Sequence, residues 1–142
     1  MASNSLLFLC TGNSCRSQMC EGYAKQLFPD EWTILSAGIE AHGKNPRAIS
    51  IMAEDGLDIS AQESTVLSDE MIEQTHYFVT VCGHADEHCP VLPPGKIRIH
   101  WPLPDPAKAT GTEEEITEQF RAVRDEVKQR MYALSAELLD EA

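Results

Sequence analysis

The first part of the chain alternates short apolar runs with segments in which apolar residues recur at helical spacing. Residues 5–10 are almost continuously apolar, which predicts a strand that is covered on both faces. Apolar side chains recur at helical spacing over residues 17–28, and Pro29 closes the segment, so we expect a helix there. Residues 32–37 then predict a second strand.

The same alternation continues through the middle of the chain. A helix is expected to begin near Pro46 and to stop at Gly56, and Ser68 can cap a further short helix. Two more strands are predicted over residues 77–82 and 96–100.

The last third of the chain contains a proline-rich loop and a long helix. Apart from the strand over residues 96–100, the prolines between residues 90 and 106 indicate loop. Thr112 and Glu115 form a capping box that predicts the start of the helix. Its apolar stripe, which should face the sheet, consists of Ile116, Phe120, Val123, Val127, Met131, Leu134 and Leu138.

Strands that alternate with helices predict an α/β fold with a doubly wound, four-stranded parallel sheet flanked by helices. The length of 142 residues fits one domain over residues 1–142. Ligands of such folds bind beyond the carboxyl ends of the strands. Cys10 and Cys82 both lie at the carboxyl end of a predicted strand, so two thiols can share one edge of the sheet.

Charge and hydropathy restrict the partners. The chain carries 23 acidic and 11 basic side chains, and its formal net charge of −12 repels nucleic acids and anionic membrane surfaces. An anionic substrate would therefore have to be held by local donors. The apolar start of the chain is too short to span a bilayer and lacks the features of a signal peptide, so we expect a cytoplasmic protein, and we expect it to be a monomer.

The loop after the first strand combines two cysteines with small or polar residues and an arginine. It consists of Cys10, Thr11, Gly12, Asn13, Ser14, Cys15, Arg16 and Ser17. Backbone N–H groups of a tight loop before a helix converge on one point and can hold an oxyanion, and Arg16 can grip two of its oxygens. Gly12 and Asn13 tolerate the left-handed conformations that such a loop requires. We therefore expect residues 11–16 to bind an oxyanion substrate.

Cys10 occupies the centre of this loop. The field that holds an oxyanion also favours a thiolate, which makes Cys10 a nucleophile at neutral pH, and Ser17 can donate a hydrogen bond to it. The alternative is an ordinary turn in which Cys10 is a buried residue at a strand end. The position of the loop between a buried strand and a helix favours the nucleophile.

Five segments of the chain resemble a known family. They are CTGNSCRSQM at 10–19, SAGIEAHGKNP at 36–46, VCGHADEHCPVLPP at 81–94, the pair Asp105-Pro106 and FRAVRDEVK at 120–128. The first resembles the phosphate loop that low-molecular-weight tyrosine phosphatases share with thioredoxin-coupled arsenate reductases. The likeness to the reductases extends over nearly the whole chain, and it implies the low-molecular-weight phosphatase fold and the reduction of arsenate to arsenite in arsenic detoxification.

Five cysteines in a cytoplasmic chain indicate catalysis, redox exchange or metal binding. If the stretch between Cys82 and Cys89 were regular helix, their Cα atoms would stand about 10 Å apart along the axis, beyond the limit of about 7 Å for a disulfide. A bond between them would require local unwinding. The alternative is a metal site with His84 and His88, but this spacing lacks the paired C-x2-C arrangement of common zinc sites, so we expect no metal.

The resemblance assigns roles to particular residues. Cys10 would attack arsenate, Cys82 would attack Cys10 and release arsenite, and Cys89 would take over the disulfide, which thioredoxin would reduce. Asp105 would be the general acid for the leaving oxygen. No organic cofactor is implied.

Other positions depart from the family pattern or have no implied role. The residues after Asp105-Pro106 are Ala107 and Lys108 in place of the substrate-holding tyrosines of the phosphatases, which favours a small inorganic anion. Cys15 and Cys20 are interpreted as spectators. Some family members bind potassium at positions that correspond to Asn13, Glu21, Ser36 and Thr65, the last of which has no charge here.

Two other functions stay open at this point. One is a phosphatase that uses Cys10, Arg16 and Asp105, with Cys82 and Cys89 as a protective redox switch. The other is a non-enzymatic sensor of an anion, against which the lack of a basic nucleic-acid-binding face argues.

Overall fold

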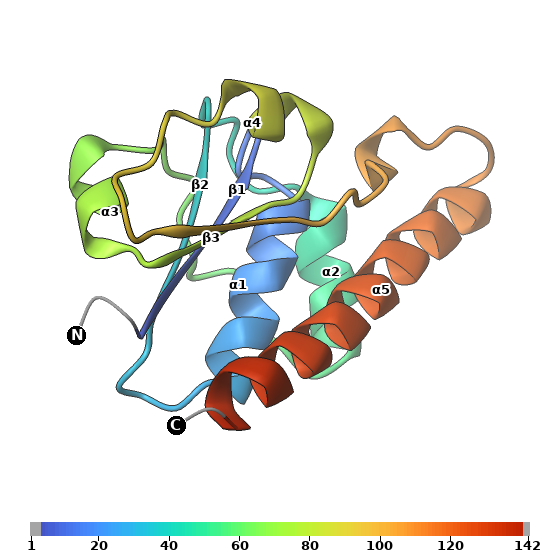
Figure 1. Cartoon of the computed structure of the whole chain (residues 1–142). Helices are drawn as coiled ribbons and strands as arrows, with labels where there is room; N and C mark the ends of the chain where they lie inside the picture. Colours follow the sequence, from blue (N-terminus) through green and yellow to red (C-terminus); the bar gives the residue numbers. More distant parts are fainter. Residues whose placement is uncertain (1–3, 141–142) are drawn as a thin grey trace.

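The four predicted strands form one parallel sheet. The computed structural model describes residues 4–140, without the side chains of residues 84, 86 and 140. The strands are β1 (Ser5–Cys10), β2 (Thr33–Gly38), β3 (Tyr77–Thr80) and β4 (Ile97–His100). They are arranged in the order β2-β1-β3-β4, and every neighbouring pair is parallel (Figure 1). All six residues of β1 are buried, as their continuous apolar run predicts.

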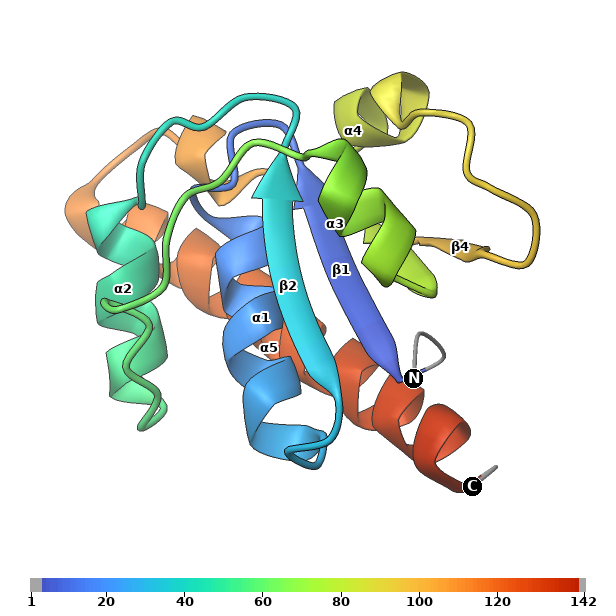
Figure 2. The same ribbon diagram turned by 90° about the vertical axis from the view of Figure 1, so that its left-hand side faces the viewer.

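The helices cover both faces of the sheet. They are α1 (Arg16–Leu27), α2 (Pro46–Glu54), α3 (Asp69–Gln74), α4 (Gly83–His88) and α5 (Glu113–Asp140), with a 3-10 turn, η1 (Pro106–Lys108), before α5. Figure 2 shows α1, α2 and α5 on one face of the sheet and α3 and α4 on the other. The predicted α/β fold with a doubly wound, four-stranded parallel sheet is confirmed.

The capping box and the apolar stripe account for α5. The Thr112 N–H donates to Glu115 Oε1 and the Glu115 N–H donates to Thr112 Oγ1, each over 3.1 Å. Phe120, Val123 and Val127 in the middle of the stripe are buried against the rest of the core. Over the described residues, no helix has the length and apolarity needed to cross a membrane.

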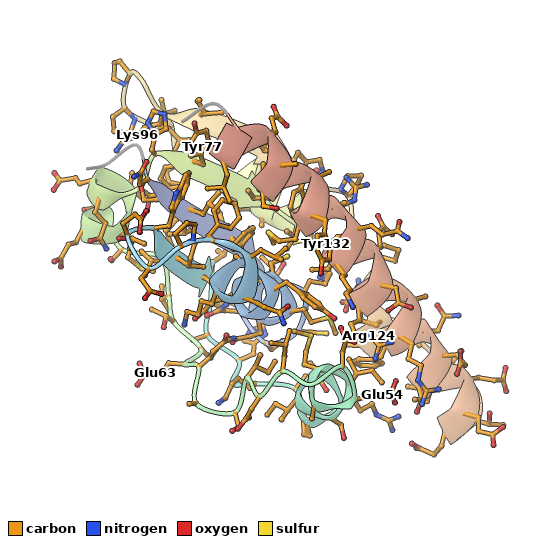
Figure 3. The ribbon with its side chains drawn as sticks, turned by 90° about the horizontal axis from the view of Figure 1, so that it is seen from below. Glu54, Glu63, Tyr77, Lys96, Arg124 and Tyr132 are labelled. Atoms are coloured by element: carbon orange, nitrogen blue, oxygen red, sulfur yellow. The ribbon has the colours of Figure 1, made fainter. Side chains whose placement is uncertain are left out.

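Ion pairs between arginines of α5 and a glutamate of α2 join these two helices. Arg124 Nη1 lies 2.9 Å from Glu54 Oε1, and Arg121 Nη2 lies 2.8 Å from Glu54 Oε2. Figure 3 labels Glu54 and Arg124 where the two helices meet. These contacts hold α2 in place, and α2 is preceded by the loop over residues 39–45 that supports the site described below.

The structure differs from the sequence prediction around Cys82. The strand predicted over residues 77–82 ends at Thr80, which pairs with the last residue of β4, His100. Cys82 is instead the residue that precedes α4, and its Sγ accepts the Ala85 N–H over 3.3 Å. A sequence pattern cannot separate a strand end from a helix cap when both residues are apolar and buried.

Candidate active site

A cavity of about 550 Å³ opens at the carboxyl edge of the sheet. One wall is the loop after β1, with residues 10–12 and 14–16, and Cys82 and Gly83 at the start of α4 form another. His42 and the segment of Asp105, Ala107 and Lys108 complete the lining. The structure thus brings Cys82 and Asp105, which are far away in the sequence, together with Cys10 and Arg16 of the loop. Cys89, at the other end of α4, does not line the cavity.

The loop after β1 turns its carbonyl groups away from the cavity. Consecutive carbonyls from Cys10 to Ser14 accept hydrogen bonds of 2.9–3.1 Å, four of them from backbone N–H groups of residues 39–45 and one from the Gln18 side chain. A trans peptide group points its N–H opposite to its C=O, and none of the described peptide bonds is cis. The N–H groups of residues 11–15 therefore point to the other side, where the cavity lies.

Asn13 holds the tightest part of this loop. Its φ of +48° lies in the left-handed region, and its side chain is completely buried. Asn13 Oδ1 accepts the Thr65 N–H over 2.8 Å, while Nδ2 donates to Ser17 Oγ over 2.8 Å and to Ser36 Oγ over 3.0 Å. These bonds stabilise a conformation that costs most non-glycine residues about 1–2 kcal/mol.

Gly12 is needed for a reason other than the one expected from the sequence. Its backbone is not left-handed, but a Cβ at this position would lie 2.3 Å from Nδ1 of the His42 ring. Gly38, at the end of β2, has the same requirement, because a Cβ there would lie 2.1 Å from the carbonyl oxygen of Glu40. Both glycines let residues 39–45 approach the loop closely enough to bind its carbonyls.

Ser17 directs a hydroxyl group at Cys10. The two atoms Ser17 Oγ and Cys10 Sγ are 2.9 Å apart, and both side chains are buried. Because Ser17 Oγ already accepts a hydrogen bond from Asn13, its own proton is available for the sulfur. The Cys10 sulfur therefore has a hydrogen-bond donor directed at it.

Arg16 and Asp105 form the far side of the cavity. Arg16 Nη1 donates to the Leu103 carbonyl over 3.1 Å, and Nη2 lies 3.6 Å from Asp105 Oδ2. Asp105 Oδ1 accepts the Ala107 N–H over 3.0 Å and so caps η1. The guanidinium group is therefore held between two fixed oxygens, with its remaining N–H groups available to an anion.

The second thiol of the cavity, Cys82, has two hydrogen-bond partners. Thr11 Oγ1 lies 3.4 Å from Cys82 Sγ, and the Ala85 N–H donates to the same sulfur. Since Thr11 follows Cys10 directly, this contact joins the loop after β1 to the start of α4. Cys89, which follows α4, is half-buried.

The other two cysteines are protonated thiols. Burial, together with the nearby Asp105 carboxylate, raises the pKa of Cys15 to about 12. Complete burial in α1 raises the pKa of Cys20 well above its usual value. A neutral buried thiol is a poor nucleophile, which agrees with the interpretation of both as spectators.

The residues of the suspected potassium site bind one another. Ser36 Oγ donates to one oxygen of Glu21 over 2.5 Å, and Lys25 Nζ lies 2.5 Å from the other. Thr65 contributes its backbone N–H, a donor, to Asn13. This set does not fit a potassium ion, which needs free oxygen ligands. Lys25 was not recognised from the sequence, because its role depends on contacts of Glu21 with β2.

No cluster of three or more His, Cys, Asp or Glu side chains suited to a metal ion occurs among the side chains that the structure describes. His84, one of the four potential ligands between Cys82 and Cys89, lies outside the described side chains.

Comparisons with known proteins agree with the fold. The family model "Low molecular weight phosphotyrosine protein phosphatase" matches residues 5–142. An arsenate reductase from Halalkalibacterium halodurans is 52% identical over 131 residues, which cover 92% of this chain and 94% of that protein. An arsenate reductase from Bacillus subtilis is 51% identical with the same coverage.

Solved structures give the same result. A structure described as "An arsenate reductase in the phosphate binding state" is 34% identical, covers 95% of this chain and 98% of its own, and superposes with a TM-score of 0.78. A thioredoxin-dependent arsenate reductase from Corynebacterium glutamicum, 23% identical, covers 97% of this chain and 63% of its own, and it shares the fold with a TM-score of 0.79.

The fold and the loop around Cys10 define a protein of the low-molecular-weight phosphatase class. The chain belongs to the low-molecular-weight phosphotyrosine protein phosphatase family, and within that family to the enzymes of the arsenate reductase group. The resemblance stated from the sequence is confirmed.

Proposed function

We propose that this chain reduces arsenate to arsenite by passing two electrons through Cys10, Cys82 and Cys89. The observation that carries the proposal is the position of the three thiols. Cys10 and Cys82 open into one cavity, and a six-residue helix leads from Cys82 to Cys89. The arsenate reductases that are about half identical to this chain support the choice of substrate.

Arsenate binds first. The N–H groups of residues 11–15 and the Arg16 guanidinium hold its oxygens, and the Cys10 thiolate attacks the arsenic atom. Asp105, which lines the same cavity, protonates the departing oxygen, so that water leaves and a bond forms between Cys10 Sγ and arsenic.

Cys82 performs the redox step. The Thr11 hydroxyl and the Ala85 N–H both lie within hydrogen-bond distance of Cys82 Sγ, which acts as a thiolate in this step. This thiolate attacks Cys10 Sγ, the sulfur–sulfur bond forms, and the bond from sulfur to arsenic breaks. Its electron pair stays on arsenic, which leaves as arsenite, while Cys10 and Cys82 are oxidised to a disulfide.

Cys89 then moves the disulfide away from the cavity. Its thiolate attacks Cys82 Sγ, and Cys10 leaves as a thiolate that is ready for another substrate. Since α4 separates the two residues by about 10 Å along its axis, it must unwind for this bond to form. A helix of six residues is marginal without tertiary contacts, which makes local unwinding accessible.

The reductant in this proposal is thioredoxin. The reductase from Corynebacterium glutamicum is named as thioredoxin-dependent, and it shares the fold of this chain. Val91, two residues after Cys89, is 98% exposed and offers apolar surface beside the outgoing disulfide. We also propose a cytoplasmic location, where a thioredoxin system keeps thiols reduced.

The test is the behaviour of Cys89→Ser. With thioredoxin, its reductase and NADPH, this variant should release about one equivalent of arsenite and stop as a Cys10–Cys82 disulfide, which mass spectrometry detects. The matched control is Cys20→Ala, which removes a buried thiol outside the relay and should turn over repeatedly. Repeated turnover of Cys89→Ser at the wild-type rate would exclude the relay.

The competing function is a phosphatase, because the family model and the set of Cys10, Arg16 and Asp105 fit a phosphate ester as well. Cys82→Ser separates the two. Hydrolysis of p-nitrophenyl phosphate should survive this substitution, whereas arsenate reduction should be lost. If the wild-type chain hydrolyses the ester but releases no arsenite, the phosphatase is the correct assignment.

A further inference from the structure

The cavity around Cys10 lies in a strongly acidic protein. The chain has a formal net charge of −12, and the site adds the carboxylate of Asp105 and, in the proposed reaction, the thiolate of Cys10. An arsenate ion must enter against this field. Among the described side chains, the basic ones that line the cavity are Arg16, His42 and Lys108.

Two of these three groups have a carboxylate beside them. Arg16 Nη2 lies 3.6 Å from Asp105 Oδ2, and its other terminal nitrogen is bound to a carbonyl. His42 Nε2 lies 2.6 Å from Glu40 Oε2 at the rim. The positive charge of Arg16 is therefore partly offset for an anion that approaches from solvent.

Lys108 differs from both. Its side chain is exposed, and no ion pair or side-chain hydrogen bond joins it to another residue in the described part of the chain. Its backbone is well fixed, because the Lys108 N–H donates to the Asp105 carbonyl over 3.2 Å within η1. Asp105, which pairs with Arg16, therefore also fixes the backbone of Lys108, whose side chain lines the cavity.

We propose that Lys108 is a substrate-recruiting residue that draws tetrahedral oxyanions into the cavity and favours small, doubly charged ones. The inference rests on the proposed function and concerns the same site. Near neutral pH arsenate is partly a dianion, so its attraction to a cation at the mouth exceeds that of a singly charged competitor. Once the oxyanion is bound by the loop, the N–H groups and Arg16 hold it, and the chemical steps no longer depend on Lys108.

Steady-state kinetics test the role in catalysis. Lys108→Met should raise KM for arsenate roughly threefold to tenfold at low salt and change kcat less than twofold, since a charge near the mouth acts on association. Added salt should shrink the difference, because it screens exposed charges. Lys108→Arg should restore the wild-type KM.

The control variant is Lys96→Met. Lys96 directly precedes β4, so it lies at the amino edge of the sheet, opposite the cavity (Figure 3). Its Nζ donates to the Glu73 carbonyl over 2.8 Å. The substitution removes one positive charge, as Lys108→Met does. An equal increase in KM for both variants would show that only net charge matters and would overturn the proposal.

A second measurement does not require arsenate. Cys10 is alkylated with iodoacetate, an anion, and with iodoacetamide, which is neutral, and mass spectrometry follows the peptide that contains Cys10. Lys108→Met should lower the iodoacetate rate about threefold or more and leave the iodoacetamide rate unchanged. An unchanged ratio of the two rates refutes the recruiting role. A changed ratio in a protein that releases no arsenite supports it and shows instead that the proposed reaction is wrong.

Discussion

The helix between Cys82 and Cys89 offers a direct test of the relay, because its stability should set the rate of disulfide transfer. Gly83 is the first residue of α4, and a Cβ at this position would meet no atom within 4 Å. Gly83→Ala therefore introduces no clash. In a helix alanine is more stable than glycine by roughly 0.5–1 kcal/mol.

This difference adds to the cost of unwinding α4. If unwinding precedes the attack of Cys89 on Cys82, the attack should slow by about twofold to fivefold, since 1.4 kcal/mol corresponds to about a factor of ten. The reverse change is Glu87→Gly, at an exposed position of the same helix. It should accelerate the attack by a similar factor.

The assay is a single turnover with arsenate and without external reductant. Acid quench and mass spectrometry follow the Cys10–Cys82 disulfide as it disappears and the Cys82–Cys89 disulfide as it forms. The first disulfide should form at the same rate in all three proteins, because Cys10 and Cys82 line the same cavity and the proposed attack of Cys82 on Cys10 does not involve Cys89 at the other end of α4. If both variants transfer the disulfide at the wild-type rate, unwinding of α4 does not control the relay.

Three further predictions concern the cavity and its support. Ser17→Ala removes a hydrogen bond to the Cys10 thiolate, which is worth about 1.5–3 kcal/mol, and should slow alkylation of Cys10 by iodoacetamide at least tenfold; an unchanged rate would contradict the role of this hydroxyl. The hydrogen bond from Tyr23 and an ion pair lower the pKa of Asp55 in the folded protein. The contribution of Asp55 to the free energy of unfolding is therefore fully present above its usual pKa of about 3.9, and it is lost as the pH falls through the lower folded-state pKa. Urea unfolding at several pH values should show a steeper loss below about pH 4 in the wild type than in Asp55→Asn, and parallel curves would refute this reasoning. Gly38→Ala places a Cβ 2.1 Å from a backbone oxygen and should lower the free energy of unfolding by about 1–3 kcal/mol, together with the affinity for phosphate, whereas wild-type values for both would refute the requirement for glycine.

Much of the site could be predicted from the sequence because its main parts are local. The loop from Cys10 to Ser17 lies between a buried strand and a helix, and both elements follow from residue patterns within a few positions of it. The resemblance to a known family then linked it to Cys82, Cys89 and Asp105. The structure places the side chains of Cys82 and Asp105 in the cavity with Cys10, and Cys89 at the far end of α4.

The support of that loop could not be predicted, because it comes from distant parts of the chain. Residues 39–45 bind its carbonyls only because β1 and β2 pair in a register that sets Cys10 beside Gly38. The contacts of His42 with Gly12 follow from the same register. In a single sequence, neither the spacing nor the type of these residues indicates that they will contact the loop after β1.

By itself, the sequence determined most of the elements and the candidate nucleophile, Cys10. Apolar periodicity, prolines, and the capping box of α5 act over a few residues, so they can be read without a structure. The tertiary structure decided what surrounds Cys10: the outward carbonyls of its loop, and the positions of Cys82, Asp105 and Lys108 in the lining of the same cavity. These depend on how strands pair and how loops meet at the edge of the sheet, and such long-range contacts form only when the whole chain has folded.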